Sequence, residues 1–205
     1  KNTAWEGGFR SPFMVRWPGK IKAGVVSNEI MSNLDWLPTF LAAAGEPDVA
    51  EKLLKGHQAA GKTFKVHLDG YNFLPYLTGQ ERKGPRDRYF YFSDDGNLLA
   101  MRYQNWKVHF MVQDQAGTLE IWQRQFRGLR SPYLFNLRTD PFEQATITSN
   151  TYWDWYFDRS FALYALPDVV GEFLATFEEF PPRQKAASFT IDQALEALQQ
   201  PHGGK

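Results

Sequence analysis

The 205-residue sequence predicts an α+β fold, in which a small four-stranded antiparallel sheet is followed by C-terminal helices. Three segments rich in aromatic and aliphatic residues follow one another closely, at Arg88–Phe92, Leu98–Tyr103 and Trp106–Met111. Short polar connections separate them, as between the strands of hairpins. Further along, residues 153–163 and 168–180 carry apolar side chains at helical spacing. A meander of strands followed by helices accounts for both patterns.

The first half of the chain predicts shorter elements. Phe13–Trp17 is mostly apolar and lies between prolines, so we expect a short strand. Residues 33–45 predict a helix with Asp35 as its N-cap. Trp36 and Phe40 are expected to face inward from this helix. A strand and a helix would therefore precede the central meander.

The remaining elements are predicted from shorter patterns. Residues 46–63 are dominated by polar residues and glycine, which favours an irregular surface connection. Residues 71–78 predict a short helix that ends at a glycine. Residues 119–122 alternate and would extend the sheet, and residues 133–137 would supply its edge strand. A capping box at residues 190–193 predicts a last helix.

Composition and charge exclude several classes of partner. The chain has 23 basic and 23 acidic side chains, so electrostatic capture of nucleic acid or of an anionic membrane is not expected. No apolar run approaches the roughly 20 residues of a membrane-spanning helix. Aromatic residues make up 16% of the chain, which suggests apolar surface concentrated in a few elements. Some of that surface could face another part of a larger protein.

The most informative segment is the first, where residues 1–12 read Lys-Asn-Thr-Ala-Trp-Glu-Gly-Gly-Phe-Arg-Ser-Pro. The glycine pair permits a tight turn beside a ligand or another chain segment. Lys1 would present a compact ammonium group with three donors, which suits a tetrahedral oxyanion. Glu6 and Arg10 are four residues apart and could pair across the glycines, which would fix the backbone next to Lys1. By residue type alone, however, such a lysine is more often solvated surface.

Other polar residues are better explained by structural roles. His57 and His67 lie around a loop and are expected at the surface. His109 lies among apolar strand residues and is expected to be a hydrogen-bonded core or face residue. The acidic segment Asp94–Asn97 fits a hairpin turn better than a metal-binding loop. Glu143 is expected to orient the turn after the edge strand.

Three segments resemble the sulfatase family. Residues 1–12 resemble its second signature, Lys-x-Thr-x-Trp-Glu-Gly-Gly-x-Arg-x-Pro, and an apolar segment with Trp-Pro-Gly follows as in that family. Residues 67–79 resemble its Asp-Gly-x-x-Leu-x-Pro-x-Leu-x-Gly segment, and residues 134–143 are similar to its Leu-Tyr-Asp-Leu-x-x-Asp-Pro-x-Glu segment. The three segments occur in the family's order, and the overall likeness is to bacterial arylsulfatases.

This resemblance implies an α/β parent fold like that of alkaline phosphatase. The chain is then expected to be a C-terminal fragment, in which residues 1–86 end the catalytic domain and residues 87–205 form a C-terminal subdomain. The implied activity is the hydrolysis of sulfate esters, and the implied location is the periplasm or the cell exterior. The implied partners are a sulfate ester substrate and the N-terminal catalytic portion of the same enzyme.

The family's chemistry needs groups that this sequence lacks. Sulfatases carry a formylglycine made from the first residue of a Cys/Ser-x-Pro-x-Arg motif, and they bind a divalent cation, usually Ca²⁺. The chain has no cysteine, and Ser11 and Ser131 precede prolines without the required arginine spacing. The Asp and Asn ligands of the calcium ion are expected upstream of residue 1, so no metal site is expected here. The resemblance carries over only Lys1, as the catalytic residue that binds the sulfate, with Glu6 and Arg10 in support.

Two alternatives stay open at this point. Phosphonate and phosphate monoester hydrolases share the fold, and some share the formylglycine, so the upstream motifs would have to separate them from sulfatases. Alternatively, this portion acts only as a non-catalytic interaction module, which its lack of a nucleophile favours.

Overall fold

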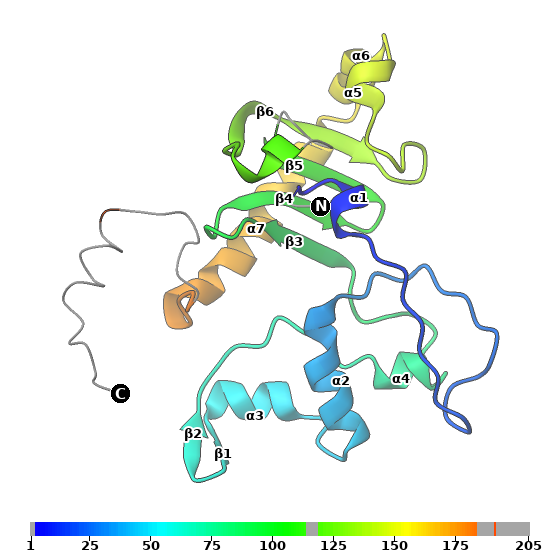
Figure 1. Ribbon diagram of the computed structural model, residues 1–205, viewed down its shortest axis with the longest axis vertical. Coiled ribbons are helices and arrows are strands. Elements are labelled where there is room, and N and C mark those ends of the chain that lie inside the picture. Colours follow the sequence, from blue (N-terminus) through cyan, green and yellow to red (C-terminus); the bar gives the residue numbers. More distant parts are fainter. Residues whose placement is uncertain (1–2, 114–118, 184–190, 192–205) are drawn as a thin grey trace.

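A four-stranded antiparallel sheet forms the centre of the second half of the chain (Figure 1). The computed structural model describes residues 3–113, 119–183 and 191, and the sheet lies within them. Its strands are hydrogen-bonded in sequence order, so the expected meander and the α+β class are confirmed. The strands are β3 (Arg88–Phe92), β4 (Leu98–Tyr103), β5 (Trp106–Val112) and β6 (Arg127–Asn136).

The alternation of side chains along β3 places its aromatic rings on two opposite faces of the sheet. Phe90 stacks on Phe173 of α7, with ring centroids 4.0 Å apart. Tyr91 points the other way and meets Phe9 of α1, with centroids 4.7 Å apart. The sheet is therefore a middle layer between α7 and the opening segment (Figure 1). These helices are α1 (Glu6–Phe9) and α7 (Phe161–Glu179).

The largest apolar core lies against β5 and β6. Leu134 and Phe135 are buried there and pack against Tyr152 and Tyr156. The hydroxyl of Tyr152 donates to the carbonyl of Leu134 at 3.1 Å and accepts from its amide at 3.0 Å. These bonds satisfy the phenol inside the core. The helices that follow β6 on this side are α5 (Ala145–Thr148) and α6 (Tyr152–Asp158).

The first half forms a group of short elements beside the sheet (Figure 1). The helices expected within residues 33–45 and 71–78 are confirmed, but the irregular connection expected at residues 46–63 is wrong. That segment holds α3 and a hairpin, because its Lys and Glu residues are good helix formers and Val49 supplies a buried contact. The elements are η1 (Asn33–Asp35), α2 (Trp36–Ala43), α3 (Val49–Lys55), β1 (His57–Ala59), β2 (Lys62–Phe64) and α4 (Leu74–Leu77).

A buried ion pair joins the start of α2 to the segment that leads into β3. The carboxylate of Asp35 is fully buried and accepts hydrogen bonds from Arg86 at 2.6 and 2.9 Å. It also accepts from the backbone amides of Ser32 and Tyr71, both at 2.8 Å. Asp35 lies at the expected N-cap position of α2, but its side chain makes no capping hydrogen bond there. It completes instead the capping box of Ser32, which begins η1.

The strand expected at Phe13–Trp17 is also wrong. The segment has no regular secondary structure, and no strand among the described residues pairs with it. Met14 is 95% exposed, so the segment keeps its apolar composition without a core to bury it. Phe40, which was expected to face inward, is 63% exposed on the outer side of α2. The structure therefore leaves apolar side chains uncovered in this half.

The later elements differ from expectation at their boundaries. Residues Leu119–Trp122 form a 3-10 helix, η2, instead of a strand. The sequence predicts a break between two helices at residues 164–167, but the break between α6 and α7 lies at residues 159–160. α7 continues through Pro167, which has no amide hydrogen and so leaves out one backbone hydrogen bond. The last expected helix, at residues 194–198, lies outside the described residues. Within the described part, no single helix has the length and hydrophobicity of a membrane span, and α6 and α7 reach them only as a pair bent by 55°.

Replacing Arg86 with methionine is expected to destabilise the fold by about 3–5 kcal/mol, because Asp35 would keep a buried charge without its partner. Lys52→Met, in the exposed ion pair with Glu46, is the matched control and should change stability little. Urea denaturation followed by tryptophan fluorescence measures both variants. Equal effects of the two substitutions would contradict the role assigned to the buried pair.

Candidate functional site

The opening segment is folded into a compact turn against the sheet. α1 is a single helical turn, in which the amide of Gly8 donates to the carbonyl of Trp5 at 2.8 Å. A Cβ atom at Gly8 would lie 2.7 Å from the carbonyl oxygen of Thr3, so the approach of these two backbones requires glycine. Lys1, the expected catalytic residue, lies outside the described residues, and its role stays a prediction.

The side chain of Glu6, the first residue of this turn, is buried among hydrogen-bond donors and cations. Its Oε1 accepts from the hydroxyl of Tyr91 at 2.8 Å and from Nζ of Lys107 at 2.9 Å. Its Oε2 accepts from Nη1 of Arg102 at 3.2 Å. Arg10 is farther away, with Nε 3.8 Å from Oε2 and a side chain that is 58% exposed. The expected Glu6–Arg10 pair is present, but Lys107 and Arg102 are the closer partners, and support of Lys1 by the pair stays a prediction.

A second buried acid, Glu143, contacts the same group from the turn after β6. Its Oε2 accepts from the backbone amide of Glu6 at 2.6 Å. Its Oε1 lies 2.6 Å from Nε2 of His109 and 3.0 Å from Nζ of Lys107. Lys107 also donates to the carbonyl of Ala4 at 2.6 Å. We call the following residues the buried charge cluster: Glu6, Tyr91, Arg102, Lys107, His109 and Glu143.

Within the cluster the carboxylates of Glu6 and Glu143 face the cations Lys107 and Arg102. Burial lowers the pKa of His109, and the hydrogen bond to Glu143 offsets this only in part. The neutral ring therefore donates from Nε2, and Nδ1 stays buried without a hydrogen-bond partner among the described residues. Burial acts to raise the pKa of Glu143, but the His109 hydrogen bond and the Lys107 charge outweigh it and hold that pKa below its usual value. Burial raises the pKa of Tyr91 well above its usual value, so the phenol remains a donor.

Sequence reasoning found only part of the cluster. The hydrogen-bonded position of His109 is confirmed. The expectation for Glu143 was incomplete, because its carboxylate ties the turn after β6 to β5 and to the opening segment. Lys107 was missed, although a signal existed. Lys107 and His109 alternate with apolar residues in β5, so both point to the same face of the strand. A strand this apolar is expected to be buried, so its polar side chains need partners inside the protein.

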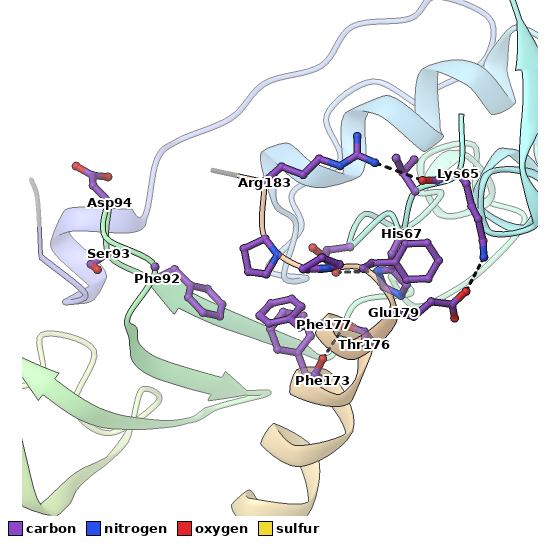
Figure 2. Close-up of a pocket in the computed structure, with 16 residues that line it drawn as sticks. Lys65, His67, Phe92, Ser93, Asp94, Phe173, Thr176, Phe177, Glu179 and Arg183 are labelled. Atoms are coloured by element: carbon purple, nitrogen blue, oxygen red, sulfur yellow. Dashed lines mark hydrogen bonds and ion pairs between the residues drawn. The ribbon is translucent and has the colours of Figure 1, made fainter. Parts of the chain in front are cut away.

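A pocket of about 610 Å³ lies on the other face of the sheet (Figure 2). It is formed between the C-terminal end of α7, residues 65–69 and the turn between β3 and β4. Phe92, Phe173 and Phe177 supply its aromatic wall. Because these rings lie on the α7 side of the sheet, the pocket is separated from the buried charge cluster by the sheet itself.

The charged side chains of the pocket are largely paired with one another. Nζ of Lys65 lies 2.7 Å from the carboxylate of Glu179, and Nδ1 of His67 lies 3.1 Å from that of Asp69. Arg183 donates to a backbone carbonyl at 3.4 Å. The pocket therefore offers aromatic surface more than free charge. Neither here nor elsewhere in the described part of the chain do three or more His, Asp or Glu residues gather to hold a metal ion.

Comparisons with known proteins decide the family. The family model described as the C-terminal region of aryl-sulfatase matches residues 84–202, more than half of the chain. The chain belongs to the sulfatase family. A second model, described as sulfatase, matches residues 1–46, which include the turn above the buried charge cluster. The division expected at residue 86 stays a prediction.

The relatives are sulfatases from animals and bacteria. Human arylsulfatase A is 35% identical over 153 residues, which are 70% of this chain and 27% of the relative. The ulvan-active sulfatase of Formosa agariphila is 29% identical over 172 residues, which are 73% of this chain and 31% of the relative. Among solved structures, the PsFucS1 sulfatase from Pseudoalteromonas sp. has a TM-score of 0.68 at 27% identity and covers 88% of this chain and 32% of that one. This chain therefore spans about a third or less of each relative.

The lowered pKa of His109 predicts a loss of stability in mild acid. Folding favours the neutral ring, so this contribution is complete above the ordinary histidine pKa of about 6.5 and is lost as the pH falls below it. His109→Gln should weaken the pH dependence of stability between about pH 7.5 and pH 5.5, because glutamine keeps a donor for Glu143 and does not titrate. Urea midpoints at the two pH values measure the effect.

His57→Gln is the control for this measurement, because His57 is part of the peripheral β1–β2 hairpin and lies outside the cluster. It should keep the pH dependence of the unmodified chain. If His109→Gln also keeps it, protonation of His109 is not what weakens the fold.

Proposed function

We propose that this chain is the C-terminal part of an enzyme that hydrolyses sulfate esters, in which Lys1 binds the sulfate group. Membership of the sulfatase family supports a sulfuric ester hydrolase. The observation that carries the proposal is the anchored opening segment, because the residues that follow Lys1 carry the family signature and are held by buried hydrogen bonds. An ammonium group placed beside the ester can stabilise the negative charge that develops on its oxygen.

The other catalytic groups are proposed to come from the N-terminal portion of the same enzyme. They are the formylglycine nucleophile and the Asp and Asn ligands of a calcium ion. The chain has no cysteine, and its described residues offer no ligand cluster, so neither group fits the residues present here. The part proposed for this chain is to present Lys1 to the sulfate.

An exposed apolar surface supports docking of the N-terminal portion. Met14 is 95% exposed and Val26 is 90% exposed, and the outer side of α2 adds Leu37 and Phe40. Phe13 contacts Trp36, which stacks on Phe40, so the apolar side chains of residues 13–17 continue onto α2. Apolar surface of this kind often marks an interaction site. We propose that the N-terminal portion covers this surface. The proposed location of the enzyme, the periplasm or the cell exterior, rests on the resemblance to bacterial arylsulfatases.

Two other functions are compatible with the same features. A phosphonate or phosphate monoester hydrolase could use Lys1 in the same way, since those esters also present tetrahedral oxyanions. The names of the relatives favour sulfate. A non-catalytic interaction module is favoured by one observation, the aromatic pocket beside α7, because ligand binding there needs no nucleophile.

The complete enzyme should hydrolyse p-nitrophenyl sulfate in the presence of Ca²⁺, and Lys1→Ala should lower its turnover by about 10²- to 10³-fold, as expected for loss of one preorganised charge-stabilising group. Lys20→Ala is the matched control, because Lys20 is exposed in a turn that follows the signature. Circular dichroism checks that each variant is folded. Unchanged turnover in Lys1→Ala would remove Lys1 from the site, and a preference for a phosphonate monoester would favour the alternative hydrolase.

The separately expressed N-terminal portion should form a one-to-one complex with this chain. Met14→Glu should weaken the complex at least about tenfold, because a charge would enter an apolar interface. Gln125→Glu introduces the same residue at an exposed position on the sheet side and should leave the affinity unchanged. Isothermal titration calorimetry measures both variants. Equal affinities for the two would place the interface elsewhere.

A further inference from the structure

We propose that Lys107 and Glu143 are positioning residues for catalysis, which hold residues 3–6 on the sheet and thereby fix the place from which Lys1 reaches the sulfate. This inference rests on the proposed function. It assigns to the C-terminal sheet a part in turnover, although the sheet supplies no residue that touches the substrate.

The opening segment is attached to the rest of the protein through its main chain. Its main chain is bound twice, by Lys107 at the carbonyl of Ala4 and by Glu143 at the amide of Glu6, both at 2.6 Å. Trp5 lies between these two attachments, and its ring centroid is 4.3 Å from that of His109. A single helical turn such as α1 is too short to be stable alone. The conformation of the segment therefore depends on the buried charge cluster.

Lys1 is only two residues before Thr3 in the chain. Thr3 is 6% exposed and lies at the start of the anchored segment. Consecutive Cα atoms are about 3.8 Å apart, so the Cα of Lys1 is within about 7.6 Å of that of Thr3. A shift of Thr3 would therefore move the region within which the chain can place Lys1. A misplacement of about 1 Å in a catalytic group can lower the rate about a hundredfold.

The opening segment is held by buried, charged hydrogen bonds. Buried ion pairs are a costly means of stabilisation, and apolar residues of similar volume often serve as well. Charged hydrogen bonds are directional, however, and each oxygen of Glu6 and Glu143 has a defined partner. Directional bonds of this kind can select one position of a segment. We infer that this selection of one position is the role of the buried charge cluster.

A double-mutant cycle in the complete enzyme tests the inference. Lys107→Met and Tyr91→Phe are each made in the wild-type and in the Lys1→Ala backgrounds, and kcat is measured on p-nitrophenyl sulfate. If the cluster acts through Lys1, Lys107→Met lowers kcat at least about tenfold in the wild type and less than about twofold once Lys1 is absent. Tyr91→Phe removes one hydroxyl from Glu6 without changing shape, so it decides the test if Lys107→Met fails to fold.

Tyr152→Phe is the matched control for Tyr91→Phe. Both tyrosines are buried in the same subdomain, but the hydroxyl of Tyr152 bonds to the backbone of Leu134 and not to the opening segment. Tyr152→Phe should lower the thermal midpoint and leave kcat at the wild-type value. A purely structural cluster would make the two tyrosine variants behave alike.

The outcomes separate this inference from the proposed function. If Lys1→Ala lowers turnover but the cluster variants lower kcat by the same factor in both backgrounds, the cluster does not act through Lys1 and the inference alone is wrong. Folded cluster variants with wild-type kcat overturn it as well. If the wild-type enzyme does not hydrolyse sulfate esters, the proposed function fails and the inference falls with it.

Discussion

A single buried lysine holds together parts of this chain that are far apart in sequence. Lys107 contacts the carbonyl of Ala4, 103 residues away, and the carboxylates of Glu6 and Glu143. Without its charge, both carboxylates would remain buried with less compensation, which costs far more than the loss of a surface pair. The position of the opening segment and the closure of the turn after β6 both depend on this interaction.

The rest of the chain can be understood as a support around that interaction. The sheet carries the opening segment on one face, and α7 covers the other face through the stacking of Phe90 on Phe173. The buried Asp35–Arg86 ion pair connects the start of α2 to the segment that leads into β3. The apolar side chains around Met14 stay uncovered on the outside of this support. That arrangement suits a part that completes a larger enzyme.

The sequence predicted those features that depend on local patterns. β3, β4 and β5 were located to within one residue, because their apolar runs and polar turns are adjacent in the chain. The strand at residues 13–17 was wrong because a strand is defined by its partner, and none lies in the described part of the chain. Lys107 was missed as a site residue because its two acids come from distant segments, and a linear pattern does not show that they converge. The histidine beside it was placed correctly, since an imidazole inside an apolar strand nearly always finds a hydrogen bond.

Hydrogen exchange of the chain, followed by mass spectrometry of its peptides, tests the anchoring most directly. The amides of residues 3–9 should exchange nearly as slowly as those of β4 and β5, because the amide of Glu6 is bound to a buried carboxylate. Residues 11–17 should exchange quickly, since they have no regular structure and are exposed. Exchange of residues 3–9 at the rate of residues 11–17 would contradict the claim that the buried charge cluster fixes the opening segment.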